Sequence, residues 1–273
     1  MRWTPGGSRH NLEDRRGMGI GGGTVGIGSV VIALLLSVFF GQDFVSSLGT
    51  TAPAARNPAE DQARSRQEEP TVEFINFVLN DTQSTWQRVL GSRYRDAKLV
   101  LFRDAVATAC GSAPAAVGPF YCPADEKVYI DLTFFEELER RFGASGDFAK
   151  AYVLAHEIGH HVQNVLGLTK QVSAGQRSNP DAAKALSVRL ELQADCLAGV
   201  WGNSTRERGL LEKGDMEEGL GAASAVGDDR IQWRAGGTVN PDSFTHGSSA
   251  QRAQWFRRGL ESGQVETCDT FAR

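Results

Sequence analysis

The chain has 273 residues, a formal net charge of −4 and 23% charged residues, which is enough for one well-buried domain with accessory segments. Its basic residues are scattered along the sequence, and this distribution argues against a nucleic-acid-binding surface. We therefore expect a globular protein with an additional segment near its amino terminus.

The first predicted element is a membrane-spanning helix over residues 18–41, inside a stretch without charged side chains. At a rise of about 1.5 Å per residue, this length crosses a hydrocarbon core of about 30 Å. Four arginines precede it, and this predicts that residues 1–17 are a cytoplasmic tail. The alternative is a cleaved signal peptide, because Ala52-Pro53-Ala54 resembles a cleavage site, although it lies far beyond the apolar run. The expected location is the cytoplasmic membrane, with a single crossing, the amino terminus inside and the remaining domain periplasmic or extracellular.

After the predicted span, residues 42–70 are polar, rich in Ala and Pro, and without an apolar period, so they are expected to be a linker. A folded domain is predicted over residues 71–273. It opens with a helix and continues with short strands in "AKLVLF" and "KVYIDL" and a short helix in "TFFEELERRF". Two longer helices are expected at about 147–166 and 180–201. The predicted class is α+β, mostly helical with a small sheet.

The four cysteines, an even number, are typical of an oxidising compartment. Cys110 and Cys122 bracket a loop rich in Gly, Pro and Ala, which a disulfide would hold closed. Cys196 and Cys268 then form the second predicted pair. The alternative is four reduced, buried thiols.

A short histidine-rich motif lies in the first long helix. His156-Glu157-Ile158-Gly159-His160 matches the H-E-x-x-H pattern of zinc peptidases. Residues i and i+4 share one helix face, so His156 and His160 can bind one zinc ion. Glu157 lies about 100° around the helix axis, where it reaches a water on the ion rather than the ion itself. His161 projects away from the ion and is expected to be a packing residue, or one that supports the ligands, rather than a ligand.

A catalytic zinc site needs a third protein ligand. The metzincin pattern would need Gly at 163 and His at 166, but these positions hold Gln163 and Leu166. The second long helix supplies Glu191 as the third ligand and, four residues later, Asp195 to orient a ligand histidine. Taken singly, the histidines could be core residues and Glu191 part of a solvated face. Their combination on two apolar helices favours a metal site.

One isolated histidine, His246, precedes Ser248 and Ser249, which are candidate N-caps of a helix expected near residues 248–260. A peptidase needs a second donor to the oxyanion besides the metal, and His246 is the candidate for this catalytic role. The alternative is that it shapes the turn before the helix. The sequence leaves both open.

Several motifs in order make the chain resemble the bacterial neutral zinc metallopeptidases of the YpfJ type over nearly its whole length. They are "MRW", "DRRG", "GPFYCPAD", "VYIDLTFF", "AHEIGHHVQ", "ELQADCLAGVW" and "THGSSAQR". The resemblance implies a zincin-like fold in which residues 127–132 form an edge strand where a peptide substrate pairs. Thr245-His246 is similar to a Thr-His-Pro segment of membrane-linked gluzincins of the HtpX kind, where the histidine reaches the active site. Here Gly247 replaces the proline.

The predicted function is a membrane-anchored zinc endopeptidase in which Glu157 activates a zinc-bound water for attack on peptide bonds. The expected partners are a peptide or protein substrate and, through residues 18–41, the membrane; no nucleic acid is expected. The alternative is a non-catalytic envelope protein that binds zinc and acts through its partners. Glu157 favours catalysis, because a structural zinc site usually fills its four positions with Cys or His.

Overall fold

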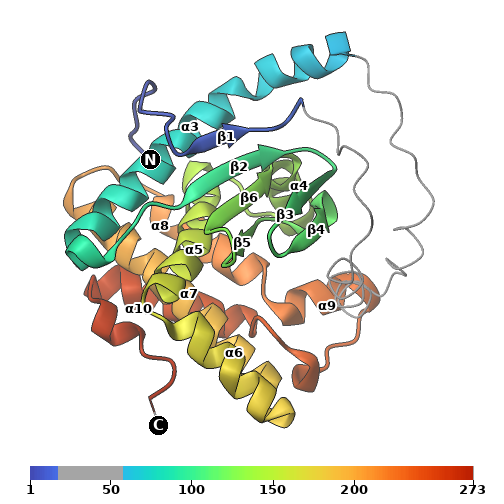
Figure 1. Cartoon of the computed structure of the whole chain (residues 1–273), viewed down its shortest axis with the longest axis vertical. Coiled ribbons are helices and arrows are strands. Elements are labelled where there is room, and N and C mark those ends of the chain that lie inside the picture. The colour runs from blue at the N-terminus through green and yellow to red at the C-terminus, as the bar shows by residue number, and fades with distance from the viewer. Residues whose placement is uncertain (18–57, 273) are drawn as a thin grey trace.

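The computed structural model describes residues 1–17 and 58–272 (Figure 1). The predicted membrane-spanning helix, residues 18–41, and residues 42–57 of the predicted linker lie outside the described residues. Within the described ranges, no helix has both the length and the apolar character needed to cross a membrane. The helices are α3 (Pro58–Leu90), α4 (Thr133–Phe142), α5 (Asp147–Val165), α6 (Leu168–Ser178), α7 (Ala183–Glu207), α8 (Asp215–Ala225), α9 (Asp228–Gly236) and α10 (Ser249–Ser262). The strands are β1 (Leu12–Asp14), β2 (Lys98–Phe102), β3 (Ala105–Thr108), β4 (Gly111–Pro114), β5 (Phe120–Cys122) and β6 (Lys127–Asp131).

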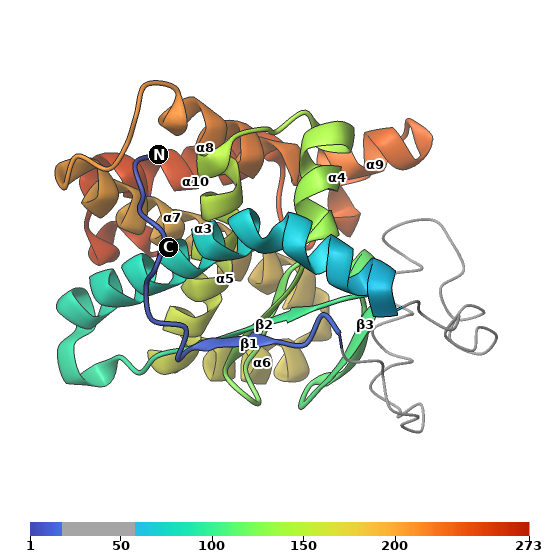
Figure 2. The same cartoon turned by 90° about the horizontal axis from the view of Figure 1, so that it is seen from above.

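The predicted α+β class, mostly helical with a small sheet, is confirmed. The main sheet has the strand order β1-β2-β6-β5, in which β5 is antiparallel and the others are parallel. Alternate residues of a strand point to opposite faces. Leu99 and Leu101 accordingly join the large core beneath α3 and α5, whereas Val100 and Phe102 pack against the β3–β4 hairpin. Helices α7 and α10 lie beyond α5, on the side away from β1 (Figures 1 and 2).

Residues 1–17 are part of this folded body, so their prediction as a separate cytoplasmic tail is wrong. Strand β1 pairs in parallel with β2, from Leu12 opposite Leu99 onward, and α3 runs beside it (Figure 2). A single membrane crossing after residue 17 would place β1 and β2 on opposite sides of the membrane. The predicted topology, amino terminus inside and domain outside, is therefore incompatible with the sheet.

The arginines that suggested a cytoplasmic tail form ion pairs within the domain instead. Arg9 binds Glu69 and Glu73 of α3. Arg16 is 3% exposed, and its Nη1 lies 2.8 Å from a carboxylate oxygen of Glu68. The positive-inside rule counts charge without regard to partners, and here the partners lie in a helix that follows residues 18–57.

The predicted linker and domain start are also wrong where the structure describes them. Helix α3 begins at Pro58 and continues through Pro70, so residues 58–70 are helical and the domain does not begin at residue 71. Glu68 ties this turn of the helix to the folded domain, because besides Arg16 it binds the buried guanidinium of Arg103 at 2.6 Å. A fragment starting at residue 71 would lose these contacts together with β1.

The strand expected at the sheet edge is an interior strand. Residues Lys127–Asp131 pair with β2 on one side, and Lys127–Tyr129 pair with β5 on the other. The end strand on this side of the sheet is β5, which is three residues long and lies within the loop that the sequence assigned to a disulfide. That disulfide, Cys110–Cys122, and the second, Cys196–Cys268, are both present as predicted.

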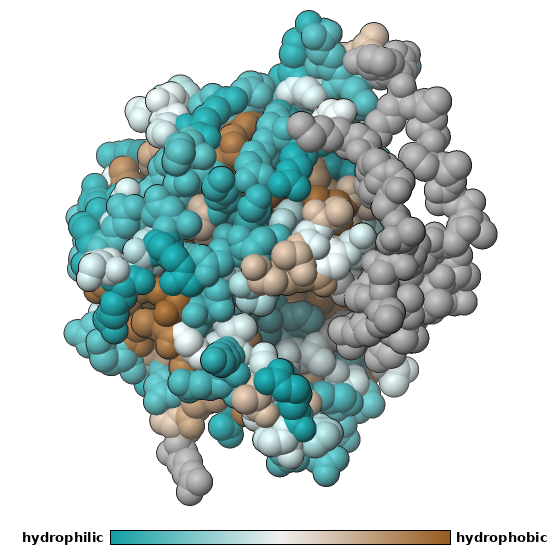
Figure 3. All heavy atoms as spheres, in the orientation of Figure 1, coloured by the Kyte–Doolittle hydropathy of each residue, from teal (hydrophilic) through white to brown (hydrophobic). Residues whose placement is uncertain are grey.

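Two close helix crossings bring the functional residues together. A Cβ on Gly159 of α5 would lie 2.9 Å from the carbonyl oxygen of Ala194 in α7. A Cβ on Gly259 of α10 would lie 1.9 Å from the carbonyl oxygen of Cys196. Neither contact tolerates a larger side chain, so glycine permits both crossings. On the face shown in Figure 3, the described surface is mostly hydrophilic and its apolar patches are small and separate.

Candidate metal centre

The structure brings the three predicted metal ligands, His156, His160 and Glu191, to one point between α5 and α7. Their ligand atoms all lie within 4.8 Å of one another. Nε2 of His156 is 3.2 Å from Glu191 Oε2, and Nε2 of His160 is 3.4 Å from Glu191 Oε1. Both histidines therefore face the carboxylate with Nε2, and they do so from one face of α5, as the i and i+4 spacing predicts.

The donor set and its charges fit a divalent cation. Two imidazole nitrogens and one carboxylate oxygen are a known ligand set of catalytic zinc sites. Burial alone would raise the pKa of Glu191, but the charges of His160 and His246 hold it well below its usual value. Burial opposes a charge on His156 too, yet Asp195 raises its pKa to about 9. Protons on the imidazoles thus balance the negative charge of the carboxylates, a role that a bound cation would also fill. Zinc binding releases such protons from its ligands.

Asp195 lies where the sequence placed it, behind a ligand histidine. Its Oδ1 is 2.8 Å from Nδ1 of His156, and the carboxylate is fully buried. Two further residues were missed by the sequence analysis. Tyr152 donates its hydroxyl to Asp195 Oδ1, and Arg252 of α10 donates to both carboxylate oxygens at 2.9 and 3.0 Å. Tyr152 precedes His156 by four residues on the same helix face, which is the signal that could have revealed it.

Replacing Asp195 with Asn is expected to weaken zinc binding by about 10- to 100-fold, the range for losing the group that orients a ligand histidine. The neutral amide keeps the shape of the carboxylate but cannot balance the charge of Arg252. Zinc affinity is measured by competition with a chelator. Asp81→Asn is the control, because Asp81 of α3 pairs with Arg208 and is not part of the ligand cluster. An Asp195→Asn protein with wild-type affinity would remove this role from Asp195.

The second ligand histidine is held differently. Nδ1 of His160 lies 2.9 Å from Oε1 of Gln163, whose side chain is fully buried. In the sequence analysis, Gln163 served to exclude the metzincin pattern and received no role of its own. A glutamine three residues after a histidine is too common in helices to signal a contact, and only the fold shows this one.

Glu157 is 8% exposed and adjacent in sequence to the first ligand. Burial raises its pKa above the usual carboxyl value, although the neighbouring charges of His156 and His160 act in the opposite direction. A carboxylate with a raised pKa is a stronger base, and a pKa nearer neutrality still lets the carboxylic acid return the proton. The chemistry predicted for Glu157 fits this environment.

His246 lies in the turn between α9 and α10, close enough to Glu191 for its charge to act on that carboxylate. Asp228, which the sequence analysis missed, organises the turn. Its Oδ2 accepts the backbone amides of Thr245, His246 and Gly247 at 2.7, 2.7 and 3.1 Å. Its Oδ1 lies 3.1 Å from Nδ1 of the His246 ring.

The replacement of proline by glycine after His246 has a conformational reason. Gly247 has a φ of +91°, whereas proline is restricted to a φ near −65°. The next residue, Ser248, is one of the two predicted caps, and it caps α10. Gln251 completes a capping box with it. The turn therefore requires glycine at this position and is held at both ends.

His161 has the packing role expected of it. Its Nε2 donates to the carbonyl of Arg95 at 2.7 Å, and its Nδ1 accepts from the hydroxyl of Tyr121 at 2.9 Å. Burial lowers the pKa of His161, so the neutral ring is favoured. Because Tyr121 belongs to β5, His161 connects this end strand of the sheet to α5, the helix that carries the histidine ligands.

Comparison with known proteins agrees with this chemistry. Residues 1–271 match the family described as "Putative neutral zinc metallopeptidase". The chain is 43% identical over 287 residues to the "uncharacterized protein YpfJ" of Escherichia coli (strain K12), covering 100% of this chain and 99% of that protein. It is also 43% identical over 204 residues to the "uncharacterized protein Rv2575" of Mycobacterium tuberculosis, covering 71% of this chain and 68% of that protein. No solved structure matches the chain.

Proposed function

The chain belongs to this metallopeptidase family, and we propose that it is a zinc-dependent endopeptidase. The observation that carries the proposal is the combination of three converging ligands, His156, His160 and Glu191, with a buried carboxyl group at Glu157. A site that holds zinc for structure alone has no use for an acid beside the ligands. Hydrolysis needs such an acid.

The bound zinc would supply a Lewis acid that polarises the scissile carbonyl and makes water more acidic. Glu157 accepts one proton from the attacking water as the carbon–oxygen bond forms. The same carboxyl group then gives that proton to the leaving amine as the carbon–nitrogen bond breaks. The raised pKa of Glu157 supports both halves of this transfer.

We assign to His246 the stabilisation of the oxyanion that develops on the substrate carbonyl. Asp228 accepts from Nδ1 of His246, and Nε2–H is the second donor that this role requires. The same aspartate holds the backbone of the turn, and it thereby fixes the ring relative to Glu191. A donor placed before the reaction needs no reorganisation when the charge develops.

The strand proposed to pair with substrate is β5 rather than residues 127–132. A peptide can add to a sheet as a further strand at its end. Strand β5 is an end strand of the main sheet, and Tyr121 connects it to His161 and Asn164 of α5. A peptide along β5 would therefore lie beside the helix that carries both histidine ligands.

We place the described body outside the cytoplasm, because two disulfides are typical of proteins in oxidising compartments. Residues 1–17 lie on the same side as residues 58–272, since β1 and β2 share one sheet. The uncharged, apolar composition of residues 18–41 supports attachment to the membrane from that side.

Removal of the metal is the direct test. The full-length protein is expected to bind one equivalent of zinc and to cleave a reduced, unfolded substrate protein. Cleavage is measured as the release of peptides with new amino termini. A chelator should abolish this release, added zinc should restore it, and Glu191→Ala should fail to hold stoichiometric zinc. One equivalent of bound zinc without hydrolysis of any unfolded protein would favour the non-catalytic zinc-binding alternative.

A further inference from the structure

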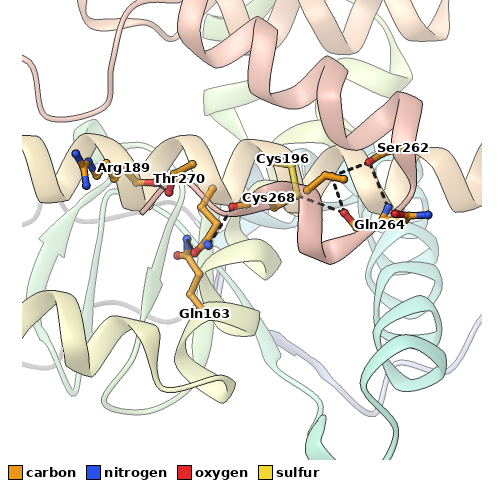
Figure 4. The surroundings of a disulfide bond; sticks show 9 residues. Gln163, Arg189, Cys196, Ser262, Gln264, Cys268 and Thr270 are labelled. Carbon is orange, nitrogen blue, oxygen red and sulfur yellow. Dashed lines mark hydrogen bonds between the residues drawn. A yellow bond between two sulfur atoms is a disulfide. The ribbon is translucent and has the colours of Figure 1, made fainter. Parts of the chain in front are cut away.

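We propose that Gln163 and Gln193 are positioning residues that fix the ring of His160, and that the Cys196–Cys268 disulfide anchors the far end of this relay. The inference rests on the proposed zinc site. The relay runs from α5 through α7 to the carboxyl-terminal segment (Figure 4).

The orientation of the Gln163 amide follows from its partners. Its Nε2 lies 2.7 Å from the carbonyl oxygen of Leu190 and 3.1 Å from Oε1 of Gln193. A backbone carbonyl can only accept a hydrogen bond, so the NH₂ group must face Leu190. The oxygen of the Gln163 amide is thereby left facing Nδ1 of His160, at 2.9 Å.

This orientation selects the form of the ligand. Oε1 of Gln163 can only accept, so Nδ1 of His160 must carry a hydrogen. The lone pair of a neutral ring is then on Nε2, the nitrogen that faces Glu191 at 3.4 Å. The backbone carbonyl of Leu190, which can only accept, therefore determines through Gln163 which nitrogen of His160 meets the metal.

Gln193 extends the relay and is oriented by the same argument. Its Nε2 donates to the carbonyl oxygen of Cys268 at 3.1 Å, so its Oε1 must face Gln163. Both glutamines are buried, at 0% and 7% exposure. Water cannot replace a lost partner easily in such a place, so each amide depends on the next.

The last acceptor in the relay is held on α7 at two points. The disulfide joins Cys268 to Cys196, and the hydroxyl of Thr270 donates to the carbonyl oxygen of Arg189 at 2.7 Å. Figure 4 shows this segment lying along α7, with Gln163 of α5 close to it. Cys196 follows Asp195, which orients the other ligand histidine. One stretch of α7 therefore supports both histidines, and the disulfide is part of that support.

The test is zinc affinity, measured by chelator competition on the full chain well below its melting temperature. Gln163→Met keeps the length of the side chain and removes both hydrogen-bonding groups. We expect it to weaken zinc binding by about 10- to 100-fold. Gln193→Met should weaken it less. Gln83→Met is the matched control, because Gln83 is 2% exposed but lies in α3 beside Tyr94.

A double-mutant cycle separates a relay from general loss of stability. If Gln193 acts through Gln163, then Gln193→Met has no further effect in the Gln163→Met protein. Replacing both Cys196 and Cys268 with Ala should likewise weaken zinc binding only while the two glutamines are present. Additive losses, or an affinity unchanged by Gln163→Met, would overturn the relay alone. A wild-type protein that binds no zinc would overturn the proposed function and the relay with it, whereas zinc binding without hydrolysis leaves the relay in place.

Discussion

Replacing Glu157 with Gln is expected to lower kcat by about 10²- to 10⁴-fold, the contribution of one general acid–base group, while the protein keeps one equivalent of zinc. The amide has the size of the carboxyl group but cannot accept a proton from water. It therefore removes the proton transfer without opening a cavity in the buried site. The three ligands, His156, His160 and Glu191, remain unchanged, so the metal content should not fall.

The measurement pairs kcat with zinc content on the same preparation of full-length protein. Glu136→Gln serves as the matched control, because this acid lies in α4 and makes no part of the ligand cluster. A Glu157→Gln protein with full zinc occupancy and wild-type kcat would show that another group carries the proton. Loss of zinc in this variant would instead make Glu157 part of the ligand set.

The part of the site that the sequence predicts is the part set by helical periodicity. His156 and His160 are four residues apart on α5, and Glu191 and Asp195 are four apart on α7. Such pairs share a face wherever a helix forms. The structure adds that these two faces meet, which the close approach at Gly159 allows.

The residues that support the ligands could not be found in this way. Gln163 is held in place by Gln193, Asp195 is held by Arg252 from another helix, and Asp228 lies 18 residues before the histidine that it holds. Glutamine, arginine and aspartate are common on helix surfaces, so their identity carries no signal. Their roles depend on which helices cross, and this is decided by tertiary packing.

The wrong prediction of a cytoplasmic tail at residues 1–17 also arose because tertiary packing decides the structure there. Strand β1 has three residues, "LED", and their alternation is too short to predict a strand. It exists because its backbone pairs with β2, from Leu12 opposite Leu99 onward. The nearby Arg9 and Arg16 then appear as part of a charged flank in the sequence, whereas in the structure they pair with glutamates of α3.

Replacing His246 with Ala is expected to lower kcat by about 10²- to 10³-fold, the loss for one oxyanion donor, with zinc content unchanged. The donor acts mainly when charge develops on the carbonyl, so KM should change little. The competing role, shaping the turn before α10, is carried largely by other groups. Asp228 binds three backbone amides of the turn, and Ser248 caps the helix.

These backbone bonds make the two roles of His246 separable. Removing the imidazole leaves the three amides on Asp228, so His246→Ala should keep a melting temperature close to that of the wild type. Asp228→Ala should lower the melting temperature, because three backbone amides, all at least partly buried, then lose their acceptor. His10→Ala, at an exposed position before β1, controls for loss of a histidine elsewhere. If His246→Ala keeps its kcat while its melting temperature falls, the histidine serves the turn, and the oxyanion donor must be sought among the other groups near Glu191.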